Sequence, residues 1–493
     1  MEGLKKLSRD LETNIAAVKK ICSGSADIVT VGVNAGNIRG AGLWCDGMLN
    51  MTLAFETFYR RIMAVRPGAY PDADALMRNL VEDDQLVIDC RLVDTYEELL
   101  YAVMTGAAAF IADGCAQAAT VVLPGFSSRA VSESYTEENV RASREGFVEP
   151  IKVNMTLIRR RLKSPELVFE TAFVGSVSHT MTAVVYLRDR VSRKLVDSVL
   201  RRLRAIDIEM VLESGFIEPF FDTGRHSLFS GTGHTERPDT LCGKLREGRI
   251  GILVDGTPFA IVLPYLFTEN FQSFDDYTNR PYYASLIRIL KYLSFYISIF
   301  LPGLYVAVSD YNPELLPAPL LFSIAQAQQN TPLPLMFEAL FITVVYEIVR
   351  EAGLRLPRPV GHAVGLVGAL VVGDAAVSAG LIGAPMVMVV ALTAISSFTI
   401  PALHEPITIL RYIFILVGGL LGPVGLSIGL CVLLLDICSI DTYGIPYTAQ
   451  VAPFSPTLFT DGFLRRGWRS QAGDPMRLSD LEGAHKEGGG DAE

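Results

Sequence analysis

The stretch that decides the fold is Ile289–Val308, which reads ILKYLSFYISIFLPGLYVAV. A helix needs about 20 mostly apolar residues to cross the roughly 30 Å hydrocarbon core of a bilayer, and this stretch has that length and composition. Arg280 and Arg288 precede this stretch. The loop that follows it, SDYNPELLPAP, carries two acids and no cation. Because basic residues mark the cytoplasmic end of a membrane helix, we predict a first span that starts in the cytoplasm.

Further apolar stretches follow toward the C-terminus. They are Leu320–Ala327, Leu333–Val349, Val360–Ala379, Pro385–Leu403 and Ile407–Ile440. The first is too short to cross and is expected at the interface or as a re-entrant piece, while the next three suit single crossings. Val360–Gly380 is rich in glycine, so this span is expected to be buried against neighbouring helices.

The last run, Ile407–Ile440, has 34 residues and would be about 50 Å long as a helix. Gly422 and Pro423 stand at its middle with three more glycines nearby, which favours a tight pair of short helices. The basic sequence GFLRRGWRS after it favours a cytoplasmic C-terminus and an even number of crossings, about six. One straight, tilted helix is the alternative, and it would place the tail outside.

The residues before the first span mix amphipathic helical patterns with short β-branched runs, which is typical of a compact α/β fold. We predict strands at Asp27–Val33, Ala118–Leu123, Leu167–Phe173, Thr182–Leu187, Ile250–Val254 and Phe259–Leu263. The turn residues Asp255 and Gly256 make IGILVDGTPFAIVLP a β-hairpin with apolar arms. The basic cluster Arg159–Arg161 is expected on a solvated helix face or, alternatively, against anionic lipid or a partner.

One internal similarity points to two related subdomains. Glu98–Pro124 and Thr240–Pro264 share a helix, a glycine, an apolar strand, the pair Asp-Gly and a second strand that ends in Leu-Pro. We therefore expect α/β subdomains at 1–150 and 151–280, a polytopic helical membrane domain at 281–445 and a largely disordered cytoplasmic tail at 446–493. The expected fold class is a cytoplasmic α/β region of two related subdomains followed by an α-helical multi-span membrane domain.

Composition limits the function. Half of the 493 residues are hydrophobic and the mean hydropathy is +0.33, which is unusual for a soluble protein. The net charge of -10 arises mainly outside the apolar runs. Because nucleic-acid-binding proteins are typically basic, no nucleic-acid partner is expected. No signal-peptide run opens the chain, so the α/β region is expected in the cytoplasm.

Motifs for chemistry are missing from the sequence. The seven cysteines form no CxxC pair and are expected to be reduced and buried, and no metal or other cofactor is expected. The sequence has no GxxxxGKS/T phosphate loop and no HExxH helix. We therefore expect that the protein is not an enzyme.

Acidic residues inside the apolar runs are candidate functional positions, because an ionisable group in hydrocarbon is costly unless it faces protein or water. Glu338 and Asp374 are the candidate pore or coupling residues, although they could instead pair with other buried groups. Glu347 and Asp436 are weaker candidates, because each lies near the end of its run and Glu347 is within one turn of Arg350.

Several of these motifs together resemble a known family. Thr235–Leu266, which contains ERPD, EGR and LVDGTPF, resembles the GerA family, the A subunits of bacterial spore germinant receptors. Ser273–Val308 is similar to the family's first-span region, and Arg350–Ile382 is similar to its basic loop and glycine-rich span. Asp436–Pro456 resembles the family's C-terminal motif.

The resemblance runs from about Asn154 to Pro456 and is weaker before it. The motif positions are Asp255 and Gly256 in the turn, and Arg355, Pro357, Arg358 and Pro359 in the basic loop. The short N-terminal region and compact tail look most like the stage V sporulation protein AF branch.

The resemblance implies a multi-pass protein of the spore inner membrane or bacterial cell membrane that acts in germination. It implies a homo-oligomer, a pentamer, whose membrane domains enclose a cation-conducting or signal-transducing path, with other germination membrane proteins and the lipid bilayer as partners. Two alternatives stay open. A secondary transporter would also suit broken helices and membrane carboxylates, and a membrane scaffold for a germination complex would have no pore.

Overall fold

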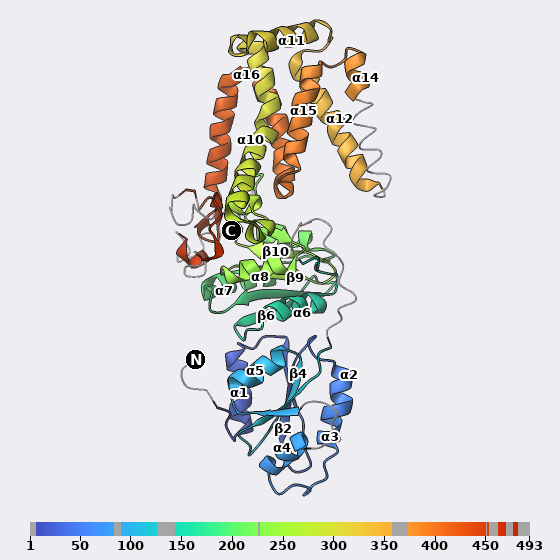
Figure 1. Ribbon diagram of the computed structural model, residues 1–493, viewed down its shortest axis with the longest axis vertical. Helices are drawn as coiled ribbons and strands as arrows, with labels where there is room; N and C mark the ends of the chain where they lie inside the picture. The colour runs from blue at the N-terminus through green and yellow to red at the C-terminus, as the bar shows by residue number, and fades with distance from the viewer. Residues whose placement is uncertain are drawn as a thin grey trace.

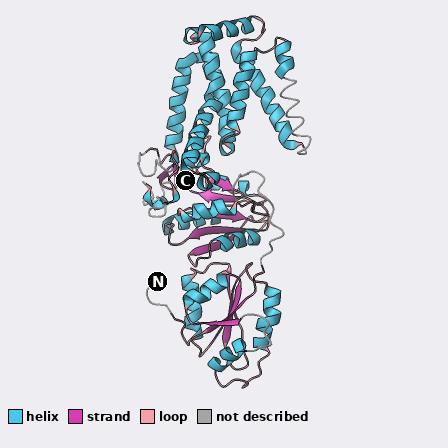
Figure 2. Ribbon diagram, in the orientation of Figure 1, coloured by secondary structure: helices cyan, strands magenta, loops and turns pink. Residues whose placement is uncertain are grey.

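The computed structural model describes residues 6–82, 90–125, 143–224, 227–356, 373–449, 451–452, 462–469 and 477–481. Figure 1 shows three parts stacked along the long axis of the molecule. We call them the first α/β unit (6–125), the second α/β unit (143–266) and the helical part (281–439). Each of the two units contains a sheet and helices. The described residues of the helical part form helices and no strands (Figure 2).

The first α/β unit is a three-layer sandwich around an antiparallel sheet in the order β1-β2-β4-β5-β3. Its strands are β1 Ile28–Gly32, β2 Gly40–Cys45, β3 Cys90–Val93, β4 Ala107–Ala112 and β5 Ala118–Val122. Its helices are α1 Leu11–Ile21, α2 Met51–Ala54, the π-turn Phe55–Tyr59, α3 Arg60–Met63, α4 Ala73–Glu82 and α5 Tyr96–Met104. Helices α1 and α5 cover one face, and α3 and α4 cover the other, so every residue of β4 is buried.

The second α/β unit repeats this architecture with the sheet order β6-β7-β9-β10-β8, again antiparallel. Its strands are β6 Leu167–Val174, β7 Thr180–Leu187, β8 Gly233–Thr235, β9 Ile250–Val254 and β10 Ala260–Leu263. Its helices are α6 Ile151–Arg161, α7 Arg193–Arg204 and α8 Pro238–Arg246, with short 3₁₀ turns at Ser214–Phe216 and Glu218–Phe220. Helices α6 and α8 cover one face and α7 covers the other.

The two units share details as well as topology. Asp113 accepts a hydrogen bond from the backbone N–H of Leu11 at 3.2 Å, and Asp255 accepts one from Ile151 at 2.9 Å, so each caps the first helix of its own unit. The glycine after each aspartate has a positive φ, 93° at Gly114 and 91° at Gly256, which a turn of this kind favours. The predicted α/β region is present and contains two sheets, and the turn at Asp255 is where it was expected.

The equivalence extends to one buried polar side chain in each unit. Asn14, three residues into α1, exchanges two hydrogen bonds with the backbone of Ser8, at 2.8 and 2.7 Å. Asn154, three residues into α6, makes the same pair with Val148, at 2.8 and 2.5 Å. Both side chains are buried, so each amide fixes the chain that leads into its helix.

All six predicted strands are present as β1, β5, β6, β7, β9 and β10. Strand β4 is the apolar strand expected within Glu98–Pro124, whereas β2, β3 and β8 of the two units were not predicted. Strands β3 and β8 are short edge strands, and β2 contains Gly40 and Gly42, which weaken any strand pattern.

The helical part contains α10 Pro281–Tyr311, α11 Ala318–Gln329, α12 Leu335–Arg355, α14 Gly373–Ser378, α15 Ala384–Ser397 and α16 His404–Ser439. Figure 1 shows α10 running away from the second α/β unit and α11 lying across the far end. Helix α11 contains the short stretch Leu320–Ala327, which was expected at the membrane interface or as a re-entrant piece. Two helical stretches among the described residues, Pro281–Tyr311 and Pro401–Ser439, are long and apolar enough to cross a membrane. These two stretches support a membrane-crossing part, but they are fewer than the six crossings that the sequence predicts.

Helix α16 is a hairpin of two helices. Gly422 at its centre has φ 63° and ψ -156°, outside any helical conformation, and Pro423 follows it. Gly429 lies beside the ring of Phe414, and Gly425 lies beside Val417, pairs that a straight helix would hold far apart. The favoured pair of short helices is thus present, and the straight, tilted helix is wrong.

The chain after α16 returns to the second α/β unit. It forms the small hairpin of β11 Asp441–Thr442 and β12 Ile445–Pro446, and Tyr443 donates a hydrogen bond to the carbonyl of Phe221 at 3.1 Å. Leu478 and Leu481 pack with Leu266 of the same unit. These described segments of the tail have defined positions, although a largely disordered tail was expected.

All seven cysteines are free thiols, and five are buried. Cys431 and Cys438 are exposed on the second arm of α16. The expectation of burial is wrong for these two because their arm has only one face against its neighbours.

Candidate functional site

Glu338 is a buried carboxylate in an otherwise apolar setting. It lies in the first turn of α12 with 1% of its surface exposed, and it accepts a hydrogen bond from the backbone N–H of Gly383, just before α15. Gly383 is also close to Ala327 of α11, so three helices meet around this carboxylate at the far end of the helical part. Among the described residues, no cation lies within ion-pair distance of Glu338.

The structure does not bring Asp374 to Glu338. Asp374 begins the short helix α14 and is exposed, and no hydrogen bond or ion pair joins the two acids within the described ranges. Asp436 is far from both. It accepts a hydrogen bond from Ser227 Oγ at 2.7 Å, where α16 reaches the second α/β unit.

Glu347 belongs to a charged cluster that also contains Arg350 and Arg411, which we call the Arg411 cluster. Arg350 Nε donates to Glu347 at 2.8 Å, and Arg411 Nη1 donates to its other oxygen at 3.3 Å. Arg411 comes from the first arm of α16 and has 1% of its side chain exposed. The expected pairing of Glu347 with Arg350 is present, whereas the arginine across the helix interface was missed.

The motif positions divide between the turn and the basic loop. Asp255 and Gly256 form the β9–β10 turn, and Gly256 also donates its N–H to the carbonyl of Glu149 at 2.9 Å. Arg355, at the end of α12, pairs with Glu351 at 2.7 Å on an exposed surface. Pro357, Arg358 and Pro359 lie outside the described residues.

A second charged cluster lies in the second α/β unit and the turn that follows it, and we call Lys244, Arg249 and Glu269 the Glu269 network. Glu269 is 1% exposed and lies 2.8 Å from Arg249 Nη2, and Lys244 also binds it. Burial alone would raise the pKa of Glu269, but the charges of Arg249 and Lys244 lower it below its usual range. Two residues later, Phe271 stacks on Tyr292 of α10 with ring centroids 4.0 Å apart.

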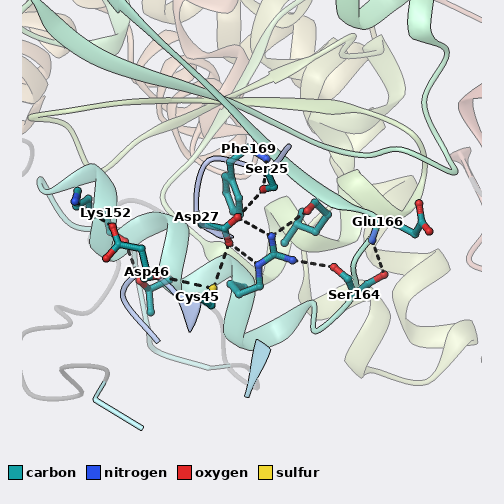
Figure 3. A network of polar contacts seen from close by, with 11 residues as sticks. Ser25, Asp27, Cys45, Asp46, Lys152, Ser164, Glu166 and Phe169 are labelled. Carbon is teal, nitrogen blue, oxygen red and sulfur yellow. Dashed lines mark hydrogen bonds and ion pairs between the residues drawn. The ribbon is translucent and has the colours of Figure 1, made fainter. Parts of the chain in front are cut away.

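A third buried cluster, Ser25, Asp27, Cys45 and Arg159, joins the two α/β units, and we call it the Asp27 network (Figure 3). Arg159 binds both oxygens of Asp27, at 2.7 and 3.0 Å, and both side chains are almost fully buried. Cys45 Sγ donates to Asp27 at 3.4 Å. Both expectations for the Arg159–Arg161 cluster are therefore wrong at Arg159, because its guanidinium crosses to the first unit instead of facing water, lipid or a separate partner.

The Asp27 network stays charged at its ion pair and neutral at its thiol. Burial alone would lower the pKa of Arg159, but the charge of Asp27 and the hydrogen bond between them raise it above its usual value. Burial and the neighbouring Asp27 carboxylate raise the pKa of Cys45 well above that of a free thiol. The thiol is thus a hydrogen-bond donor and not a nucleophile.

The model of the Bacillus/Clostridium GerA spore germination protein family matches residues 16–476. The chain belongs to the GerA family of spore germination proteins.

Individual relatives cover most of the chain. Spore germination protein KA of Bacillus subtilis is 36% identical over 96% of this chain and 87% of its own length. The uncharacterized membrane protein YfkQ of the same organism is 33% identical over 96% of this chain and 92% of its length. Spore germination protein GerLA of Bacillus cereus is 36% identical over 75% of this chain and 76% of its length.

One solved structure also aligns. It is the crystal structure of the N-terminal domain of the A subunit of the Bacillus megaterium spore germinant receptor GerK3, which is 27% identical, covers 54% of this chain and 99% of its own, and gives a TM-score of 0.42.

Proposed function

We propose that this protein is a multi-pass membrane subunit of spore germination, whose helical part contributes to an ion-conducting or signal-transducing oligomer and which has no enzymatic role. Membership of a spore germination family supports the process, and the two long apolar helices support the membrane. Copies of the chain and other germination membrane proteins are the proposed partners.

The membrane arrangement we propose has six crossings. Helix α10 leaves the second α/β unit, α12 and α15 return toward it, and the two arms of α16 go out and back (Figure 1). Most of the predicted span Val360–Ala379 lies outside the described residues. With the basic residues near Arg280 on the inner side, both α/β units and the C-terminus lie in the cytoplasm.

The observation that carries the ionic role is the burial of Glu338. A carboxylate in an apolar helix bundle, held by a backbone N–H and without a cation among the described residues, is unstable as a purely structural element. A passing cation would supply the missing charge. Exposed Asp374 at the same end is the proposed companion residue, brought to the path by a neighbouring copy.

Reconstitution of the full-length protein in liposomes tests this proposal. Cation flux should be present in the wild-type protein and should fall clearly in Glu338→Gln, which keeps the shape of the side chain and removes its charge. Glu351→Gln is the matched control, because Glu351 lies on the same helix with half of its side chain exposed. Unchanged flux in both Glu338→Gln and Asp374→Asn would remove these acids from the path.

A non-conducting scaffold is the second candidate, and the Arg411 cluster favours it. Its carboxylate is fully engaged by two arginines that bridge α12 and α16, as expected of a group that holds helices together. A wild-type protein that forms oligomers in liposomes but carries no ion flux would support the scaffold. Solute uptake driven by an ion gradient would instead support a transporter.

A further inference from the structure

The Arg411 cluster holds more positive than negative charge. Arg350 and Arg411 share the single carboxylate of Glu347, and no other ion pair reaches either arginine within the described part of the chain. Arg411 Nε donates to the backbone carbonyl of Ser298 on α10 at 3.0 Å, while its Nη2 is buried with no hydrogen-bond partner. One guanidinium donor and one unit of positive charge are left uncompensated.

This excess charge lies in an apolar environment. The Arg411 side chain is 1% exposed between α10, α12 and α16. A buried charge without a counter-charge costs several kcal/mol, so native proteins pair such groups. The cluster is therefore incomplete without an anion.

One edge of the cluster is open. Arg350 is 20% exposed and Glu347 is 15% exposed, whereas Arg411 is closed off behind them. Ile348 and Leu354, on the same stretch of α12, are 63% and 70% exposed. Leu354 lies one helical turn after Arg350, so an exposed apolar side chain lies beside this partly open arginine, as suits a surface that meets lipid.

We propose that Arg350 binds the phosphate group of an anionic lipid headgroup at the cytoplasmic leaflet, and that this phosphate also offsets the charge of Arg411 behind it. A guanidinium offers parallel N–H donors that match two oxygens of a phosphate, and the phosphodiester supplies the missing negative charge. Basic pockets between membrane helices on the cytoplasmic side take such headgroups. The bound lipid would link α12 to α16 and α10 through the cluster. This inference rests on the helical part lying in a bilayer and not on ion conduction.

The test uses the purified full-length protein in a neutral detergent. Its thermal unfolding is followed by intrinsic fluorescence after addition of dioleoylphosphatidylglycerol, the same amount of dioleoylphosphatidylcholine, or inorganic phosphate. Phosphatidylglycerol should raise the unfolding temperature above the value in phosphatidylcholine. Equal effects of the two lipids, with no effect of inorganic phosphate, would overturn the proposal.

Three variants locate the effect. Arg350→Gln should weaken the apparent affinity for phosphatidylglycerol roughly tenfold, the equivalent of one charge-assisted contact. Arg355→Gln, on the exposed end of the same helix, should leave it unchanged. An equal loss in both variants would show a general surface attraction and would overturn the site.

Glu347→Gln gives a result of opposite sign and keeps the proposal testable if Arg350→Gln does not fold. Removal of this carboxylate leaves both arginines without an anion, so stabilisation by phosphatidylglycerol should increase. A decrease would show that the cluster is a structural ion pair only and would overturn the proposal. Stabilisation by inorganic phosphate as large as that by phosphatidylglycerol would support the phosphate site and assign it to a soluble ligand.

Discussion

The two α/β units have the same strand order, the same capping aspartate and the same buried asparagine, but they differ in what they hold. The second unit holds the hairpin after α16 and the tail residues Leu478 and Leu481, and the turn that follows this unit contacts α10 through Phe271 and Tyr292. The first unit is joined to the second through the Asp27 network and the bond from Ala26 N–H to the carbonyl of Phe169 at 2.9 Å. A duplicated fold has thus become a base for the helices in one copy and an appended unit in the other.

The two units also differ in their buried charged residues. The second unit has the Glu269 network directly beneath α10, and the first unit has no counterpart among its described residues. Breaking the networks one at a time should therefore show which unit supports the helices. The three changes below are ordered by their expected effect.

Glu269→Gln should have the largest effect, on the order of 5 kcal/mol, because it leaves the buried Arg249 with only the more distant carboxylate of Glu247, 3.5 Å from its Nη1. The loss should appear as faster hydrogen exchange in β9, β10 and the start of α10, with the first unit unchanged. Loss confined to the first unit would contradict the role given to the second.

The same carboxylate gives a pH dependence. The pKa of Glu269 is lowered in the folded protein, so its contribution is complete above the unfolded value of 4.5 and is lost as the pH falls through the lower folded value. Wild type and Glu269→Gln should therefore differ most near neutral pH and converge in acid. A constant difference across that range would show that the carboxylate is not the charged partner.

Arg159→Leu should cost about 3 kcal/mol, because it leaves Asp27 as a buried charge. Exchange should rise where Ser25 and Phe169 meet, while the helical part keeps its protection. Lys152→Gln is the control, since its pair with Asp46 is exposed and worth less than about 1 kcal/mol. The double variant Arg159→Leu, Asp27→Leu should recover most of the loss; if it does not, packing rather than charge joins the units.

Asn14→Ala and Asn154→Ala should each cost about 2 kcal/mol, the usual effect of leaving buried backbone groups unpaired. Asn14→Ala should be slightly worse, because Asn14 also accepts a hydrogen bond from the Tyr96 hydroxyl at 2.7 Å. Hydrogen exchange at the first turns of α1 and α6 measures the two losses separately. A loss at only one helix would break the equivalence of the units.

Local signals in the sequence were sufficient for much of this fold. Apolar arms around Asp255 and Gly256 predict their hairpin, and the second Asp-Gly pair at Asp113 reveals the duplication, because turn chemistry acts over a few residues. Gly422 and Pro423 mark the break in α16 for the same reason. Edge strand β8 has three residues and too little pattern to predict.

Contacts between distant residues could not be predicted in this way. Asp27 and Arg159 are 132 positions apart, and no local sequence pattern near either residue indicates that they pair. Arg411 did give a signal, since it is a lone cation early in the apolar run Ile407–Ile440. Its partner Glu347 is 64 positions away, so the fold was needed to place them together.

The break at Gly422 has a mechanical consequence. Because α16 folds back on itself, its two ends and α10 meet in one core, where Ile407, Ile437 and Tyr292 pack with Phe271. Close backbone contact between Gly303 and Gly418 then couples the outgoing rods along their length. A small rotation of the second α/β unit would therefore turn α10 and both arms of α16 together. Helix α12 is linked to them through a few side chains such as Glu347.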